Sequence, residues 1–308
     1  MFYIITQFLL QTNNKVIPED VIYISGYVRS GSTILDIILG NITGYFSTGE
    51  LVFFTTNGLI DNEYCSCSNR VGDCIFWKNV ADEWESKRTL SLESYNAILY
   101  NHFRNKKSLS LFKKLLFPDS IFLNFLEDTR SLYQIISEQS GNKTIIESSK
   151  SPYRILLLRK IGLKVKVVHL VRGLNEILLA TRKTLLANPE QGIEKNIMPR
   201  NKWNVMVTWS LSNLYTKLFA MGMPKVKVRY EEMIAEPYRV VKAITYVPSP
   251  YMDKLNNRGP FLPEHVVAGN RLRMQKSFFI LKPDGNPHKR KASALGNYLT
   301  GILNWIFW

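Results

Sequence analysis

The sequence predicts an α/β fold in which a central, mostly parallel β-sheet is flanked by helices. Short β-branched runs alternate with segments long enough for helices, which is the pattern of βαβ units. Hydrophobic residues make up 45% of the 308 residues, and this fraction supports a large buried core rather than a disordered or fibrous chain. Ligands of such sheets bind beyond the carboxyl ends of the strands, so we expect functional residues there.

Four runs are expected to be strands, over residues 21–25, 143–146, 164–171 and 225–230. Helices are expected between and after them, over residues 33–40, 95–103, 122–140, 175–186 and 205–221. Chemically notable residues follow three of the runs directly: Arg29 and Ser30 come after the first, Ser149 and Lys150 after the second, and Arg172 after the third. If the strands are parallel, these residues meet at one edge of the sheet.

The chain is expected to form a single domain over residues 1–308, with a core over about 20–275. Residues 57–94 are interpreted as a cap or insertion, because their first part is turn-rich and carries all three cysteines. Residues 246–271 hold several Pro and Gly and are expected to be an irregular loop. Residues 276–308 form a basic, apolar C-terminal tail.

The chain is strongly basic, with 40 Lys and Arg against 25 Asp and Glu and a formal net charge of +15. Such an excess favours a nucleic acid, a membrane surface or a small polyanion as partner. A non-enzymatic nucleic-acid-binding protein stays an alternative on charge alone, but no helix-turn-helix, zinc-finger or aromatic sheet motif supports it. We therefore expect no nucleic-acid partner; the oligomeric state is left open.

A cytoplasmic location is expected. No apolar run reaches the roughly 18 residues needed to span a bilayer. Residues 1–11 are apolar but lack a basic n-region and a small-residue cleavage site. Residues 295–308 are apolar and follow the basic segment 289–291, so they favour either a final helix packed on the core or an amphipathic helix in peripheral contact with a membrane.

A glycine-rich loop, Gly26–Thr33, lies between the first expected strand and the first expected helix. It fits the phosphate-loop spacing GxxxxG-x-[ST], with Ser32 in place of the usual Lys. Backbone N–H groups of such a loop and the following helix N-terminus bind phosphate, and Arg29 adds a cation inside the loop. The loop predicts a P-loop NTPase-like fold. A P-loop kinase or NTPase stays an alternative, although no expected strand ends in the Asp that would hold Mg²⁺.

Further motifs follow in order along the chain. They are the cysteine element Cys65–Trp77, then Glu147–Pro152, His169–Arg172, Arg229–Met233 with Glu236 and Pro237, and Gly269–Arg273. Together with Gly26–Thr33, the set resembles the PAPS-dependent sulfotransferases of bacterial type, closer to the carbohydrate and tyrosine sulfotransferase pattern than to the cytosolic small-molecule one. The resemblance implies transfer of a sulfuryl group from 3′-phosphoadenosine 5′-phosphosulfate (PAPS) to a hydroxyl or amine, releasing adenosine 3′,5′-bisphosphate, with no metal required.

The resemblance also assigns binding roles. Residues Arg29, Ser30, Gly31, Ser32 and Thr33 would hold the 5′-phosphosulfate. Arg172 would hold the 3′-phosphate, and the late basic loop with Arg271 and Arg273 would close on it. Family members usually place a Ser eight residues after that Arg, where this chain has Ala180; Thr181, the next residue, is the candidate replacement.

Catalysis by such an enzyme needs cations at the leaving oxygen and a general base for the acceptor. Arg29 and Lys150 are the candidate cations. The resemblance places the base at Glu50, because family members of the carbohydrate and tyrosine type use a Glu shortly after the first helix. Glu147 is its rival, because it comes at the end of an expected strand. His169 lies inside a strand and is expected to be a buried, hydrogen-bonded histidine.

The three cysteines, Cys65, Cys67 and Cys74, could supply three of the four ligands of a zinc ion. A clear fourth ligand is missing from the sequence, and reduced thiols in an acceptor-side loop are an equal interpretation, so no metal site is assigned. The acceptor itself is not predicted; residues 57–94 and 185–203 are expected to form its pocket.

Overall fold

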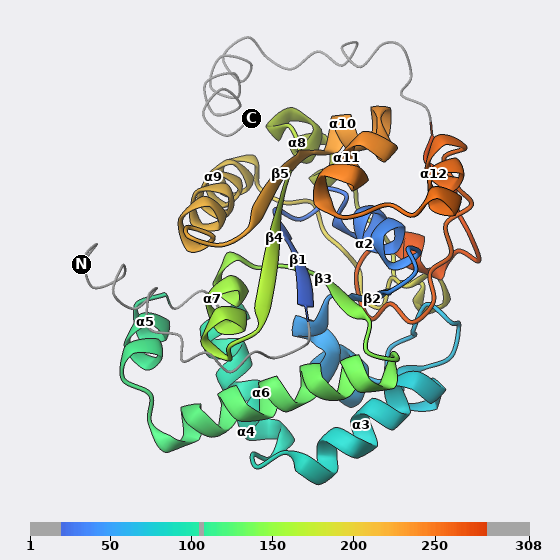
Figure 1. The fold of residues 1–308 in the computed structure, drawn as a ribbon. Coiled ribbons are helices and arrows are strands. Elements are labelled where there is room, and N and C mark those ends of the chain that lie inside the picture. Colours follow the sequence, from blue (N-terminus) through green and yellow to red (C-terminus); the bar gives the residue numbers. More distant parts are fainter. Residues whose placement is uncertain (1–19, 105–107, 282–308) are drawn as a thin grey trace.

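The computed structural model describes residues 20–104 and 108–281 (Figure 1). They form a parallel β-sheet with helices packed on both faces, which confirms the predicted fold class. Among the helices in these ranges, none combines the length and apolar composition that a membrane crossing requires. The C-terminal segment 295–308, expected on the core or at a membrane, lies outside the described residues.

The sheet has five strands in the order β2-β3-β1-β4-β5. Their bounds are β1 Asp20–Gly26, β2 Tyr45–Gly49, β3 Thr144–Lys150, β4 Lys164–Val171 and β5 Lys225–Arg229. Every neighbouring pair is parallel, so all five carboxyl ends lie at one edge. The chain leaves β1 toward β2 on one side and later crosses to β4 on the other, which makes the end of β1 a topological switch point.

Two strands differ from the sequence-based expectation. The prediction missed β2, and β3 continues to Lys150 instead of ending at residue 146. Both segments carry polar residues that pair with distant partners: Thr48 donates to the Ile146 carbonyl oxygen at 2.7 Å, and Ser148 donates to Asp36. Buried polar side chains are tolerated in a strand when such partners are present, and the partners are not visible in a local pattern.

The described helices are α2 Ser32–Gly40, α3 Ile75–Lys87, α4 Leu92–Leu99, α5 Ser108–Leu116, α6 Ser120–Gln139, α7 Pro152–Lys160, α8 Leu174–Thr181, α9 Lys202–Phe219, α10 Tyr230–Ala235, α11 Pro237–Ile244 and α12 Ser249–Asn256. Short 3₁₀ and π turns cover Leu51–Phe53, Phe54–Ile60, Val71–Asp73, Tyr100–Arg104, Pro189–Gln191 and Arg271–Met274.

Most of the expected helices are present, with shifted ends. The helix expected over 175–186 stops at Thr181, and the one expected over 95–103 is α4 followed by a π turn. Within residues 57–94, the turn-rich part is followed by α3. Residues 246–271 were expected to form an irregular loop, but they contain α12.

Strand alternation divides the core into two layers, one on each face of the sheet. Val21 and Tyr23 of β1 pack on the face covered by α3, α6 and α7. Ile22 and Ile24 pack on the opposite face, covered by α2, α11 and α12, as Figure 1 shows. Both faces of a parallel sheet are buried in this way, which explains the nearly continuous apolar run of β1.

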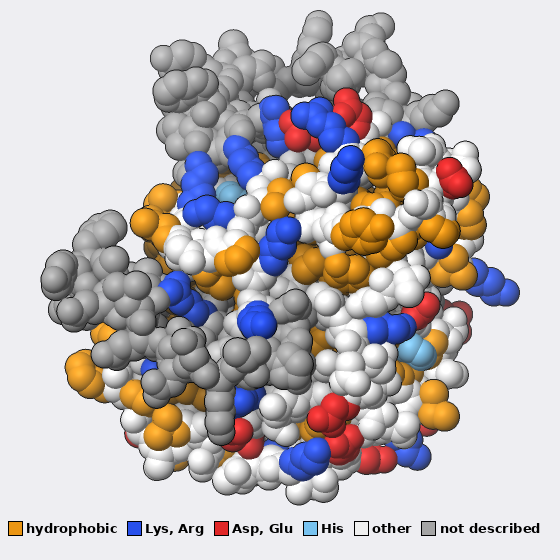
Figure 2. Space-filling model, in the orientation of Figure 1, with side chains coloured by type: hydrophobic (Ala, Val, Ile, Leu, Met, Phe, Trp, Pro, Cys, Tyr) orange, Lys and Arg blue, Asp and Glu red, His pale blue; other side chains and the backbone are white. Residues whose placement is uncertain are grey.

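Strand β5 forms one edge of the sheet, in a part of the molecule where Figure 2 shows several Lys and Arg side chains. Lys225 and Lys227 are exposed there, whereas Val228 is buried. Lysines on an edge strand hinder pairing with a strand of another chain. Part of the excess positive charge therefore lies where it protects the sheet edge.

A buried ion pair joins β3 to α7. Glu147 accepts from Nε of Arg154, and both side chains are at most 1% exposed. Tyr133 on α6 donates to Glu147 and accepts from Arg154 at 3.0 Å, so three elements meet at this network. Removing one member would leave an uncompensated charge in the core.

We expect Arg154→Met to lower the free energy of unfolding by about 3–5 kcal/mol, because the Glu147 carboxylate then stays buried without its partner. Urea denaturation followed by circular dichroism measures the change. The double variant Glu147→Gln, Arg154→Met should be more stable than Arg154→Met alone. Arg239→Met breaks the exposed pair with Glu236 and should cost under about 1 kcal/mol. An equal, small loss in both single variants would contradict the role given to the buried pair.

Candidate functional site

A cavity of about 580 Å³ opens at the carboxyl edge of the sheet. Its wall includes Arg29 from the loop after β1, Lys150 at the end of β3 and Arg172 directly after β4. The volume is in the range of small-molecule sites, and the position is the switch point of the sheet. The parallel register thus brings together the three cations that sequence analysis placed at separate strand ends.

The loop after β1 has the backbone of a compact anion cradle. Arg29 has φ 66° and Gly31 has φ 94°, both in the left-handed region. A Cβ atom at Gly31 would lie 2.4 Å from the ring of Tyr230, so only glycine fits there. Ser32 and Thr33 begin α2 and line the cavity with Gly31. Their N–H groups are therefore at the positive end of a helix.

Ser30 is the loop residue that the structure does not bring into the cavity. Its side chain is 1% exposed, it is not part of the cavity wall, and its Oγ has no hydrogen-bond partner in the structure. Its backbone N–H bonds to the Tyr27 carbonyl oxygen at 3.3 Å. The backbone of Ser30 therefore closes the turn, and its side chain is not part of the cavity surface.

The cavity wall is strongly cationic. Among the described residues, six Lys or Arg side chains and one carboxylate, Glu50, line it; the cations are Arg29, Lys150, Arg172, Lys183, Arg200 and Arg271. Burial, followed by the charges of Arg200 and Arg271, lowers the pKa of Arg29 below its ordinary value. Like charges gathered in a partly buried space repel one another unless an anion joins them, so the wall is complementary to a polyanion.

Arg172 holds the loop after β1 with one nitrogen of its guanidinium, while another nitrogen has no acceptor in the structure. Its Nη1 donates to the Arg29 carbonyl oxygen at 2.9 Å, and its guanidinium lies 4.2 Å from the centre of the Tyr230 ring. Its Nε is buried without a hydrogen-bond partner in the structure. A buried unsatisfied donor is costly and indicates a missing acceptor, such as an anionic oxygen of a ligand.

Glu50 and Lys150 form an ion pair in the cavity wall, with Nζ and Oε1 at 2.5 Å. Their side chains are 10% and 13% exposed, so water screens the pair only weakly. Glu50 follows β2 and Lys150 ends β3, so the neighbouring strand ends set their contact. The structure places the predicted base and one predicted cation side by side.

Asp36 on α2 holds the β2 end that carries Glu50. Its carboxylate accepts from the hydroxyls of Ser47 and Ser148 and from the backbone N–H of Gly49. Burial raises the pKa of Asp36 to about 7, against the lowering effect of these bonds. The carboxyl therefore links α2, β2 and β3 directly behind the cavity.

The late segment around residue 267 closes on the loop after β1. Glu50 donates its backbone N–H to the Val267 carbonyl oxygen at 2.9 Å, and Asn270 donates its own to Thr33 Oγ1 at 3.2 Å. Arg271 lines the cavity. Arg273 does not: it is 1% exposed and donates to the Tyr64 carbonyl oxygen at 2.7 Å.

Thr181 lies in the cavity wall beside Ala180, but its hydroxyl has another partner. Oγ1 donates to the Ile177 carbonyl oxygen at 2.8 Å, within α8. A phosphate needs a donor, so Thr181 would have to leave this bond to replace the missing Ser. The neighbouring Lys183, which sequence reasoning did not select, reaches the cavity without that constraint.

Two further sequence candidates lie outside the cavity. Glu147 pairs with Arg154 and Tyr133 in the core. Glu50, unlike Glu147, lines the cavity, so Glu50 is the better candidate base. His169 is buried and its Nε2 lies 2.8 Å from Asn213 Oδ1, as predicted. Burial lowers the pKa of His169 to about 4.

The segment expected to shape the acceptor pocket contributes unevenly. From the 185–203 region, apolar residues and one cation line the cavity: Leu185, Gly192, Ile193, Ile197, Met198 and Arg200. No residue of 57–94 lines it. Arg200 and Tyr230 were missed by sequence reasoning; Arg200 sits in no motif, whereas Tyr230 lies inside the motif Arg229–Met233.

No protein-family model matches the sequence, and no curated protein sequence matches it. Among solved structures, the chain is similar to the sulfotransferase domain from the olefin synthase of Synechococcus PCC 7002, with a TM-score of 0.46 and 16% identity over 96% of this chain and 97% of that one. It is similar to the sulfotransferase domain from the curacin biosynthetic pathway, with a TM-score of 0.39 and 18% identity over 91% and 90%.

A third similarity is to the sulfotransferase STF9 from Mycobacterium avium, with a TM-score of 0.42 and 12% identity over 83% of this chain and 71% of that one. Two of these structures are sulfotransferase domains and the third is a sulfotransferase. The identities are low, so any functional assignment depends on the residues of the cavity itself.

We expect Asp36→Asn to change how stability depends on pH. The raised pKa means that the folded state holds the proton more tightly than the unfolded state, so the wild type loses stability as pH rises from about 4 to about 7. The variant has no ionisable group at this position and lacks this loss. Its free energy of unfolding should therefore rise relative to that of the wild type by up to about 4 kcal/mol across that range. Urea titrations at pH 5 and pH 8 measure it, with the exposed Asp253→Asn as control. Parallel pH profiles for wild type and Asp36→Asn would refute the assignment.

Proposed function

We propose that the chain is a sulfotransferase that uses PAPS as sulfuryl donor and a hydroxyl or amine as acceptor. The observation that carries the proposal is the cavity itself, whose described wall combines a phosphate-type loop with six cations and one carboxylate. A ligand with a phosphosulfate at one end and a phosphate at the other would supply anionic oxygens to both the loop and the far cations. Isolated phosphate would leave most of the cations without a partner.

The buried groups fit such a donor. Nε of Arg172 has no partner, and its Nη1 already fixes the loop, so an oxygen beside Arg172 would complete the guanidinium. Burial, and after it the nearby charges of Arg200 and Arg271, lowers the pKa of Arg29, and a bound anion would offset the repulsion among these three cations. We assign the loop from Arg29 to Thr33 to the 5′ end of the donor, and Arg172 with Arg271 to its 3′-phosphate.

The wall does not favour metal-dependent phosphoryl transfer. None of the described strands ends in an Asp, and Glu50, the one carboxylate among the described lining residues, is paired with Lys150. A kinase or NTPase needs carboxylates to hold Mg²⁺. Magnesium-dependent ATP binding would be the result that favours that alternative.

Glu50 and Lys150 are suited to the two ends of an in-line displacement. The donor supplies an activated sulfuryl group on a phosphate oxygen. We assign Glu50 to accept the proton of the acceptor as the new sulfur–oxygen or sulfur–nitrogen bond forms. Lys150 and Arg29 then stabilise the charge left on the phosphate oxygen as the old sulfur–oxygen bond breaks. The products are the sulfated acceptor and adenosine 3′,5′-bisphosphate.

We expect the purified chain to bind adenosine 3′,5′-bisphosphate without added metal. Arg172→Ala and Arg29→Ala should each weaken binding about 10- to 100-fold, because a hydrogen bond to a charged group contributes about 1.5–3 kcal/mol. Isothermal titration calorimetry measures the affinity. Arg239→Ala removes one exposed positive charge outside the cavity and should leave it unchanged. Absence of binding at high micromolar ligand would overturn the proposal.

We expect Glu50→Gln to lower turnover about 10²- to 10⁴-fold while sparing affinity for adenosine 3′,5′-bisphosphate, because the variant keeps the shape but cannot accept a proton. Turnover is measured with radiolabelled donor across a panel of hydroxyl and amine acceptors. Glu63→Gln, also buried but not part of the cavity wall, is the matched control. Full activity in Glu50→Gln would remove it from the role of base.

A further inference from the structure

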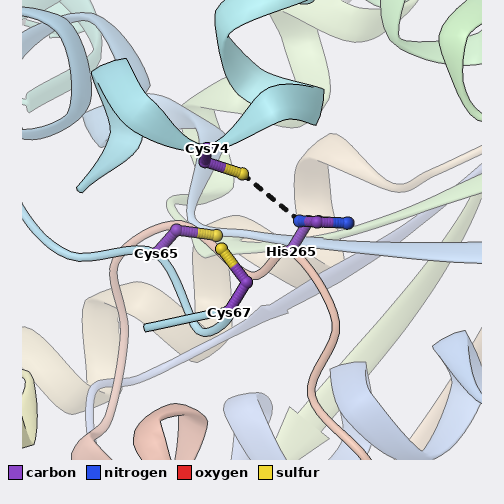
Figure 3. A group of neighbouring side chains, drawn as sticks. All are labelled: Cys65, Cys67, Cys74 and His265. Atoms are coloured by element: carbon purple, nitrogen blue, oxygen red, sulfur yellow. Dashed lines mark hydrogen bonds between the residues drawn. The ribbon is translucent and has the colours of Figure 1, made fainter. Parts of the chain in front are cut away.

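Three cysteines and a histidine converge outside the cavity (Figure 3). The three Sγ atoms of Cys65, Cys67 and Cys74 and a ring nitrogen of His265 all lie within 4.8 Å of one another. The histidine follows Cys74 by 191 positions, so only the fold brings it to the cysteines. It supplies the fourth ligand type that the sequence around the cysteines lacked.

The spacing of these atoms suits a tetrahedral ion. Zinc binds thiolate sulfur at about 2.3 Å and imidazole nitrogen at about 2.0–2.1 Å, which puts neighbouring ligand atoms about 3.5–3.8 Å apart. Sγ of Cys74 and Nδ1 of His265 lie 3.3 Å apart. Figure 3 shows the four side chains pointing toward one common centre. A small rearrangement of side chains would therefore close a four-coordinate site.

The surrounding backbone supports thiolate ligands. The N–H groups of Cys67, Asn69 and Trp77 point at the sulfur atoms of Cys65, Cys67 and Cys74, respectively. Cys65 and Cys67 lie in a tight turn closed by the bond from the Cys65 N–H to the Asn69 carbonyl oxygen at 2.8 Å. Such outer contacts orient metal ligands and stabilise their charge.

The histidine is held just as firmly. Trp77 Nε1 donates to the His265 carbonyl oxygen at 2.7 Å, and the ring of Phe76 stacks on the imidazole at a centroid distance of 5.3 Å. Ser66 lies between Cys65 and Cys67, and Val266 follows His265. The Val266 N–H donates to Ser66 Oγ at 2.8 Å, and the Ser66 N–H donates to the Val266 carbonyl oxygen at 3.2 Å. The imidazole therefore cannot turn away from the cysteines without disturbing the packing.

We propose that Cys65, Cys67, Cys74 and His265 bind one structural Zn²⁺. Four protein ligands leave no open position, so the ion has no part in catalysis. It joins the turn at residue 65 and the start of α3 to the late segment that continues to Gly269 and Arg271 in the cavity wall. The ion thereby fastens that part of the wall, and its existence does not depend on the proposed sulfuryl transfer.

Metal content and cobalt spectroscopy test the site on the full chain. The protein is purified without a histidine tag from zinc-supplemented cells, and we expect about one zinc per chain by inductively coupled plasma mass spectrometry. Reduced, metal-free protein titrated with Co²⁺ should give the intense visible absorption of tetrahedral thiolate-bound cobalt. Absence of that absorption in folded, reduced wild type overturns the proposal. So does a disulfide among these cysteines in protein purified under air-free conditions.

Variants identify the ligands. His265→Gln and Cys67→Ser, at the two half-buried positions, should each lose most of the bound zinc, whereas His102→Gln, outside the cluster, should keep it. Equal zinc content in His265→Gln and wild type would refute the histidine as fourth ligand. The wild-type cobalt titration stays decisive if a variant fails to fold.

Removal of the ion should also loosen the late segment. We expect a chelator to lower Tm by about 5–10 °C and readdition of zinc to restore it, because a ligand that binds only the folded state stabilises it. An unchanged Tm in protein shown to have lost its zinc would refute the structural role. This readout is independent of nucleotide binding, so failure of the proposed function and failure of the zinc site are separable.

Discussion

Mutual repulsion among the cations of the cavity is the constraint that the rest of the structure has to meet. Six basic side chains face one space that holds a single carboxylate among its described lining residues. The parallel sheet brings three of these cations together, because Arg29, Lys150 and Arg172 lie at or just after strand ends that share one edge. A framework of hydrogen bonds and ion pairs holds the cations in place. One of these contacts is the hydrogen bond from Arg172 to the Arg29 carbonyl oxygen.

That framework is built from buried polar groups that bond to one another. Asp36 ties α2 to the ends of β2 and β3, and Glu147 with Arg154 ties β3 to α7. Asp36, Glu147 and Arg154 do not line the cavity. Groups that stabilise the fold are therefore separate from groups that line the cavity, which explains why Glu147, inside β3, and Glu50, just after β2, have different surroundings.

The sequence predicted the sheet, four of its strands and the main cations because these features are local. A β-branched run, a glycine-rich loop and an arginine after a strand can each be recognised within about ten residues. Strand β2 and the length of β3 escaped prediction because their polar residues are buried only by distant partners. Arg200 and His265 escaped for the same reason: nothing near either residue signals a role, and only the fold brings them to the cavity and to the cysteines.

The late segment that contains Val267 also covers the carboxyl end of β2, the other edge strand of the sheet. Gly49 at the end of β2 pairs in parallel with Val267, and a Cβ atom at Gly49 would lie 2.3 Å from the Val267 carbonyl oxygen. Strand β5 protects its own edge with lysines, whereas β2 depends on a piece of chain made more than two hundred residues later. During synthesis, β2 therefore has an uncovered edge at its carboxyl end until that segment leaves the ribosome. Nascent chains are most exposed to strand pairing with one another during this interval.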